Sequence, residues 1–101
     1  MTGSDGLHDE LQREMGCTLE EFLRWLPGAT QHAPVIRQGG LYRVLADQGT
    51  VDITLEVLPE RRIASIRLPV LRVHFRFIGM GQAQRVAFLE YFDRYTMRGG
   101  G

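Results

Sequence analysis

The stretch Thr50-Val51-Asp52-Ile53-Thr54-Leu55-Glu56-Val57 alternates strictly between polar and apolar side chains. Successive side chains of a β-strand point to opposite faces, so a period of two predicts a half-buried antiparallel strand over residues 50–58. A second stretch repeats the pattern, with apolar residues at Leu71, Val73, Phe75 and Phe77 and polar ones at Arg72, His74 and Arg76. These two stretches predict the centre of an antiparallel sheet.

Further strands are predicted on either side of this centre. Residues 41–46 and 62–68 have strand composition, and turns are expected at Asp47-Gln48-Gly49 and Pro59-Glu60-Arg61. Pro69 has no amide hydrogen, so it marks a turn, a bulge or a bend at a sheet edge. The pattern leaves open whether residues 62–78 form one bent strand or two.

Helical signals precede the strands. Ser4 or Asp5 is expected to cap a short helix that presents Leu7, Leu11 and Met15 on one face. Thr18-Leu19-Glu20-Glu21 then reads as a capping box. The helix that it begins is expected to bury Leu19, Phe22, Leu23 and Leu26 and to stop at Pro27-Gly28. Residues 27–40 contain two prolines and three glycines and are predicted to form a loop.

A final helix is predicted from about Gln82 to Met97, with a buried stripe of Phe88, Leu89, Phe92 and Tyr95. The predicted fold is α+β: a two-layer sandwich with a three- to four-stranded antiparallel meander. The N-terminal helical segment and the C-terminal helix would cover one face of the sheet. Residues 1–98 are expected to form a single domain, followed by a flexible glycine tail at 99–101.

Composition is that of an ordinary globular chain, with 44% hydrophobic and 24% charged residues. There is no long apolar run to span a membrane and no signal-peptide pattern, and one cysteine cannot form an internal disulfide. We therefore expect a cytoplasmic protein.

All twelve basic residues are arginine, and lysine and asparagine are absent. Codon usage in a GC-rich, bacterial genome explains this pattern best.

Charge is segregated along the chain although the net charge is zero. Residues 1–60 hold ten acidic residues and four arginines, a balance of −6, whereas residues 61–101 hold eight arginines and two acids, a balance of +6. The two halves either neutralise one another in the fold or leave an arginine-rich face for nucleic acid or another anion.

The polar face of the second central strand is the first candidate site. Arg72, His74 and Arg76 share this face, and Arg67 is expected nearby. An open face of this kind would bind phosphates, although base stacking would need exposed aromatic residues. The preferred interpretation is a salt-paired solvent face, with Asp52 and Glu56 as cross-strand partners of the arginines.

The second candidate is Gly79-Met80-Gly81-Gln82, which joins a strand to a helix. Backbone amides of Gly79 and Gly81, together with Arg85, could hold a phosphate there. A dinucleotide fingerprint would need a third glycine and a second strand, and both are missing. A tight turn is therefore the preferred interpretation.

No catalytic constellation is visible, and the three histidines have no metal-ligand spacing. We therefore expect a non-enzymatic protein with no metal and no cofactor. Cys17 precedes the Thr18 cap among acidic neighbours, and a structural role is favoured over a reactive thiol.

The C-terminal Gly99-Gly100-Gly101 resembles the tails of ubiquitin-like modifiers and sulfur carriers, whose terminal carboxylate is adenylated. In that family the tail follows a strand, whereas here a helix is predicted to precede it. A carrier that acts through Gly100 and Gly101 is thus a third hypothesis. The leading one is an accessory domain that binds a protein partner, and nucleic-acid binding by the same arginines is the second. The sequence does not decide between monomer and homodimer.

Overall fold

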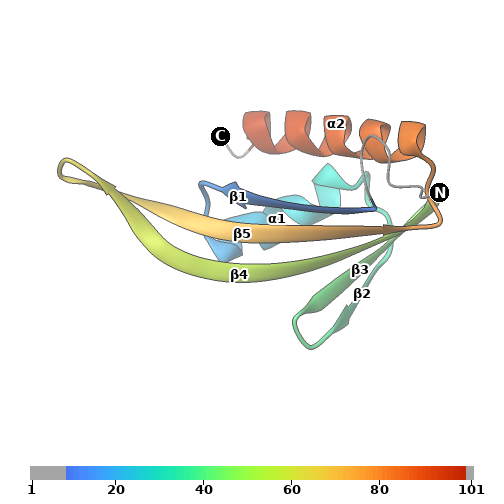
Figure 1. Cartoon of the computed structure of the whole chain (residues 1–101), viewed down its shortest axis with the longest axis horizontal. Helices are drawn as coiled ribbons and strands as arrows, with labels where there is room; N and C mark the ends of the chain where they lie inside the picture. The colour runs from blue at the N-terminus through green and yellow to red at the C-terminus, as the bar shows by residue number, and fades with distance from the viewer. Residues whose placement is uncertain (1–8, 100–101) are drawn as a thin grey trace.

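A computed structural model describes residues 9–99, which fold into five strands and two helices (Figure 1). In chain order the elements are β1 (Glu10–Met15), α1 (Leu19–Ala29), β2 (Val35–Gln38), β3 (Leu41–Ala46), β4 (Gly49–Ile63), β5 (Ile66–Ile78) and α2 (Gln82–Gly99). The predicted α+β class is confirmed, and the sheet has five strands rather than three or four.

The sheet is antiparallel throughout, with the spatial order β1-β5-β4-β3-β2. Strands β2 to β5 form the expected meander, and β4 and β5 build the long central hairpin. Strand β1 lies on the far edge of the sheet, where Leu11 is opposite Phe75 and Met15 is opposite Leu71. The N-terminal segment therefore completes the sheet.

The predicted N-terminal helix is wrong within the described residues, because residues 10–15 form β1. Leu11 and Met15 fit either period, since residues four apart share a face in a helix and in a strand. The intervening residue on that face of β1 is Arg13, whose charge hid the alternation. Arg13 forms an ion pair with Asp93 of α2, and its guanidinium lies 5.6 Å from the centre of the Phe75 ring. Ser4, Asp5 and Leu7 lie outside the described residues.

Two other expectations are corrected in the loops. Helix α1 continues through Pro27 and Gly28 to Ala29, and the predicted loop contains the four-residue edge strand β2. Pro59-Glu60-Arg61 is not a turn: it lies inside β4, where the register with β5 shifts between Leu58 and Arg61. The chain reverses instead between Ile63 and Ile66. Residues 66–78 are consequently one strand, and the predicted strand 62–68 is divided between β4 and β5.

Both helices contribute to a single hydrophobic core on one face of the sheet. The Thr18–Glu21 capping box is present, and Phe22 and Leu26 of α1 are buried, whereas Leu19 is 36% exposed. In α2, Leu89 and Phe92 are buried, but Tyr95 is 37% exposed. The core residues of the sheet are Tyr42, Val44, Val51, Ile53, Leu71, Val73, Phe75 and Phe77.

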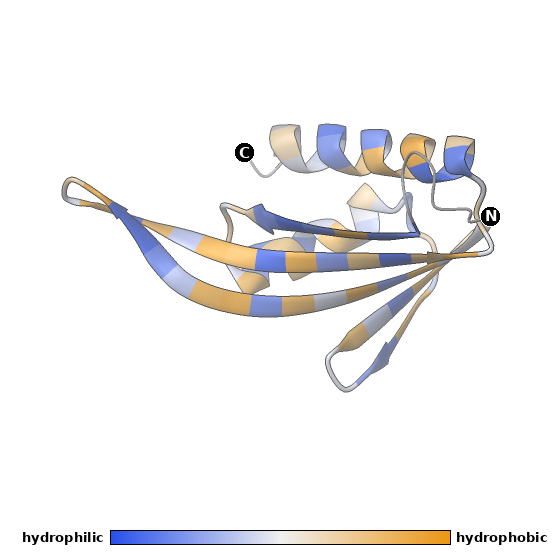
Figure 2. Ribbon diagram, viewed as in Figure 1, coloured by the Kyte–Doolittle hydropathy of each residue, from blue (hydrophilic) through white to orange (hydrophobic). Residues whose placement is uncertain are grey.

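The central hairpin is longer than its neighbours. Pairing with β3 ends at Thr54 and pairing with β1 ends at Leu71, which is the partner of Val57, so residues 58–70 pair only with each other among the described strands. We call residues 57–70 the arm. Figure 1 shows the arm projecting past both helices, and Figure 2 shows apolar residues continuing along it to its tip. The chain is accordingly elongated, 47 × 29 × 27 Å.

Candidate functional site

The face of the sheet opposite the helices carries rows of alternating charge. In one row, Glu10 of β1 is opposite Arg76 of β5, which is opposite Asp52 of β4, which is opposite Arg43 of β3. The signs therefore alternate across four strands. Opposite charges on directly paired residues stabilise an antiparallel sheet, so this row is a set of mutually neutralising side chains.

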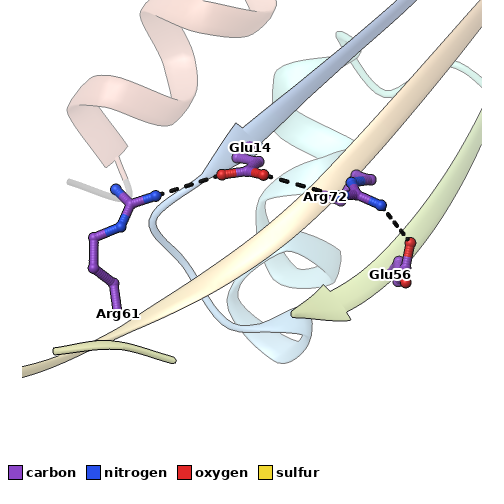
Figure 3. A network of polar contacts seen from close by, with 4 residues as sticks. All are labelled: Glu14, Glu56, Arg61 and Arg72. Carbon is purple, nitrogen blue, oxygen red and sulfur yellow. Dashed lines mark hydrogen bonds and ion pairs between the residues drawn. The ribbon is translucent and has the colours of Figure 1, made fainter. Parts of the chain in front are cut away.

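The next charged row holds Arg72, which lies between two acids (Figure 3). Its Nη1 donates to Oε1 of Glu56 at 3.1 Å, and its Nη2 is 3.9 Å from Oε2 of Glu14. Arg61 also reaches Glu14, with Nη2 3.5 Å from Oε1. Between the two rows, Nε2 of His74 is 2.9 Å from Oε1 of Glu10. The predicted pairing is therefore present between Arg72 and Glu56, whereas Asp52 forms its ion pair with Arg43, and Arg76 lies directly across from Asp52.

Asp52 is the most enclosed acid of this face. Arg43 binds it with two hydrogen bonds, from Nε to Oδ1 at 2.7 Å and from Nη2 to Oδ2 at 2.9 Å. Hydrogen bonding from Arg43 is the main reason that the pKa of the Asp52 carboxyl is lowered, and Arg76 adds to the effect. Asp52 is 9% exposed despite lying on the uncovered face, because the arginine side chains screen it.

The lowered pKa of Asp52 predicts a pH-dependent contribution to stability. A carboxyl with a depressed pKa in the folded state stabilises the fold above its unfolded pKa of about 3.9, and this is lost as the pH falls toward the folded value. Urea denaturation should therefore show that Asp52→Asn destabilises the protein at pH 7 and that the difference shrinks below about pH 4. The exposed Asp47→Asn serves as a control with little effect. A deficit that stays constant down to about pH 2.5 would contradict this assignment.

Arg67 does not belong with the other three predicted site residues. Side chains alternate along the regular strand β5, so Arg67 falls on the face opposite to that of Arg72, His74 and Arg76. It also lies in the arm, directly across from Arg62 of β4. The structure thus separates an arginine that the sequence had grouped with the sheet face.

In the turn Gly79-Met80-Gly81-Gln82, the backbone groups form hydrogen bonds with side chains of the first turn of α2. The Gly81 amide donates to Oε1 of Gln84 at 2.6 Å, and Nη1 of Arg85 donates to the Met80 carbonyl at 2.7 Å. Gly79 has a φ of 76°, a conformation that favours glycine. The amide and the guanidinium that would have held a phosphate therefore close the turn instead, which agrees with the preferred interpretation.

Cys17 is buried, 2% exposed, in the core cluster that also contains Phe22. Burial, assisted by the nearby Glu21 carboxylate, raises the pKa of its thiol to about 11. At pH 8 the thiolate fraction should be roughly 100-fold below that of an ordinary cysteine. We expect N-ethylmaleimide to modify Cys17 at least that much more slowly in the folded protein than in urea. Equal rates by mass spectrometry would show that the thiol is accessible.

Three apolar side chains of the arm, those of Val57, Ile63 and Ile66, are more exposed than any apolar side chain in the rest of the described sheet, where Ile36 reaches 46%. Val57 is 67% exposed, Ile63 54%, Ile66 58% and Leu68 40%. By alternation, Ile66 and Leu68 share the side of Arg72, and the cross-strand partner of Ile66 is Ile63. Val57, which pairs with Leu71, lies with Arg62 and Arg67 on the other side, whereas Arg61, which pairs with Leu68, lies on the side of Ile66. We call the side of Ile63, Ile66 and Leu68 the apolar side of the arm and the side of Arg62 and Arg67 the arginine side.

Two prolines lie at the edges of the arm. The Phe77 amide donates to the Asp9 carbonyl at 2.6 Å, so the odd-numbered residues of β5 direct their backbone N–H and C=O groups toward the edge where β1 lies. Pro69 is also odd-numbered and lies just beyond the last β1–β5 pair, so the amide hydrogen that proline lacks would have pointed to the free edge. Pro59 lies in the register shift of β4. Strand addition to the arm is thus disfavoured, and its faces are left for contact.

A cleft of about 380 Å³ lies at the opposite end of β4. The loop after α1, the β3–β4 turn and the first half of α2 enclose it. Sequence reasoning missed both this cleft and the arm. The central strand stretches are longer than their neighbours, which was a signal for the arm. The cleft joins three segments that are distant in the sequence, so it had no local signal.

Several expectations concern absences or undescribed residues. Gly99 is the last residue of α2 rather than part of a tail, and Gly100 and Gly101 lie outside the described residues. Across residues 9–99, no cluster of three or more His, Cys, Asp or Glu side chains is arranged to hold a metal. No helix in the same range combines the length and apolar character needed to cross a membrane.

The fold and these surfaces define an α+β domain with a projecting hairpin. A scan against protein-family models and a search of curated proteins found no match to this chain.

Proposed function

We propose that this chain is a non-enzymatic accessory domain of the cytosol that binds a partner protein through the arm. The exposure of Val57, Ile63, Ile66 and Leu68 is the observation that carries the proposal. Ile63, Ile66 and Leu68 share one side of the arm, and neighbouring exposed apolar side chains mark contact surfaces in folded proteins. The position of the arm, beyond both helices, lets a partner reach it from two sides (Figure 1).

The size of the apolar surface argues for a partner that encloses the arm. Burying each of these half-exposed side chains contributes about 1 kcal/mol, or about 4 kcal/mol for the four. Association costs at least about 4 kcal/mol in lost translational and rotational freedom. A second copy that covered only the apolar side would therefore gain too little. A groove that also contacts the arginine side would gain more.

The arginine side specifies the charge of that groove. Arg62 and Arg67 are exposed and directly opposed, and like charges in this position destabilise a strand pair. Carboxylates on a partner would relieve this repulsion. We therefore propose a partner whose groove has an apolar wall facing Ile63 and Ile66 and an acidic wall facing the two arginines.

The proposal is tested by removing the apolar tip. A photo-reactive amino acid at Leu68 would identify the contacted protein, and binding would then be measured by calorimetry with both proteins purified. Ile63→Ser with Ile66→Ser should weaken binding by about 2 kcal/mol, or roughly thirtyfold. Val35→Ser with Ile36→Ser on β2 is the matched control, because these side chains are 38% and 46% exposed and far from the arm in the sheet order. Equal losses in both variants would refute the role of the arm.

Nucleic-acid binding is a second candidate function. Arg62 and Arg67 favour it, because two directly opposed positive charges on the arm can contact phosphates. The sheet face offers less, since Arg72, His74 and Arg76 already face acids. If the two arm arginines each contact a phosphate, the affinity for duplex DNA should fall by about 1.8 log units per log of salt. Arg62→Gln with Arg67→Gln should remove that dependence. No binding to duplex or single strands at low salt would exclude this candidate.

A further inference from the structure

The cleft at the start of β4 holds polar side chains that the fold does not use. Gln31 and His32 come from the loop after α1, Asp47 and Gln48 from the β3–β4 turn, and Tyr91 from α2. Within residues 9–99, none of these five side chains has a hydrogen bond or ion pair with another residue. Met80 and Phe88 supply apolar lining. Unpaired polar groups beside apolar side chains, in a volume at the lower end of about 300–1,000 Å³, are compatible with a small-molecule site.

Asp47 is the one carboxylate among the described residues that line the cleft, and arginine is not among them, although Arg85 donates to the carbonyl of the lining Met80. The C-terminus of α1 also reaches the cleft through Ala29 and Thr30, and α1 has no basic residue in its last turn. The carbonyl end of a helix carries a partial negative charge, which favours a cation. A phosphate or carboxylate ligand would meet this field unfavourably.

The rim of the cleft is held in a costly backbone conformation. Gln31 and His32 have φ values of 57° and 60°, where residues with a side chain are disfavoured. Their amides close the end of α1, since His32 N donates to the Pro27 carbonyl at 2.7 Å. Glycine would perform this capping without strain. Side chains retained at strained positions beside a cleft suggest a role for those side chains.

We infer that this cleft binds a small organic cation, an ammonium group carried on a flat apolar body. The Asp47 carboxylate pairs with the ammonium group, and the rings of Tyr91 and Phe88 attract the cation and pack against the body. The amide oxygens of Gln31 and Gln48 accept its remaining N–H donors. This site does not depend on the arm or on the proposed partner, because the two lie at opposite ends of β4.

Two probes with the same indole body separate charge from shape. Tryptamine carries an ammonium group, whereas indole-3-acetate carries a carboxylate. Amide resonances of the ¹⁵N-labelled full chain would be followed during titration with each probe. We expect tryptamine to shift the resonances of residues 30–33 and 46–48 saturably below about 1 mM, and indole-3-acetate to leave them in place.

Variants then test the residues. Asp47→Asn should weaken tryptamine binding about tenfold, whereas Glu60→Gln on the arm should leave it unchanged. Gln31→Gly should raise the urea midpoint, because it relieves strain, and yet weaken binding. The inference is overturned if tryptamine produces no saturable shift, if indole-3-acetate binds as well, or if Asp47→Asn binds like the original chain while its spectrum shows an intact fold.

Discussion

Phe92→Ala is expected to destabilise the protein by about 3–5 kcal/mol, the range for truncating a fully buried aromatic side chain. Phe92 of α2 is 0% exposed. Its ring centre lies 5.3 Å from that of Phe75 in an edge-on arrangement, 5.8 Å from Phe22 and 6.1 Å from Phe88. Phe92 therefore joins both helices to the centre of the sheet. Its removal would leave a cavity between three elements, which could close only partly by relaxation.

Urea denaturation followed by circular dichroism measures this effect. Tyr91→Ala is the matched control, because Tyr91 is the neighbouring aromatic residue of α2 and is 38% exposed. It should cost much less than Phe92→Ala, since no buried cavity forms. A loss below about 1 kcal/mol for Phe92→Ala would mean that α2 does not pack through this face.

Gly49→Ala is expected to cost about 1–3 kcal/mol, with part of the loss arising from backbone strain. Gly49 begins β4 with a φ of 154°, outside the range that other residues adopt readily. A Cβ atom there would lie 2.8 Å from the carbonyl oxygen of Ile78 and 2.6 Å from Cγ of Met80. The methionine side chain can move, but the Ile78 carbonyl belongs to β5. The substitution must therefore shift the end of the central hairpin.

Two other glycines separate strain from overlap in the same measurement. Gly39→Ala keeps a positive φ of 60° but has no atom within 4 Å of the new Cβ, so it should cost only the strain, about 1 kcal/mol. Gly16 has neither a positive φ nor an atom within 4 Å of the new Cβ, so Gly16→Ala should change stability by less than about 0.5 kcal/mol. If Gly49→Ala cost no more than Gly39→Ala, close approach of Ile78 would not constrain this position.

The two surfaces proposed to bind ligands lie at the two ends of one strand. β4 begins at Gly49, beside the turn that lines the cleft, and ends at Ile63 in the tip of the arm. Between them the uncovered sheet face is occupied by its own ion pairs, from Arg43–Asp52 to Arg72–Glu56. The self-neutralised sheet face therefore separates the proposed ligand cleft from the proposed partner surface.

Local sequence patterns predicted the elements whose cause is local. The capping box at Thr18 depends on residues three positions apart, and the strand pattern of residues 50–58 depends on neighbouring side chains. The salt-paired face also followed from sequence, because Asp52, Glu56 and Arg72 alternate with buried residues. When two such strands pair edge to edge with their apolar side chains on one face of the sheet, their charged side chains necessarily share the other face.

Tertiary structure decided the rest, because the deciding contacts join distant residues. Arg13 can lie on the core face only because Asp93, eighty positions away, neutralises it. The arm exists because β1 and β3 end before β4 and β5 do, which depends on pairing register and not on local propensity. The cleft needs the loop after α1, the β3–β4 turn and the first half of α2 to meet. The sequence by itself determined which stretches alternate and where α1 and α2 begin, since these depend on near neighbours. Which surfaces remain uncovered depends on the order of the strands in the sheet, and only the tertiary structure decides that order.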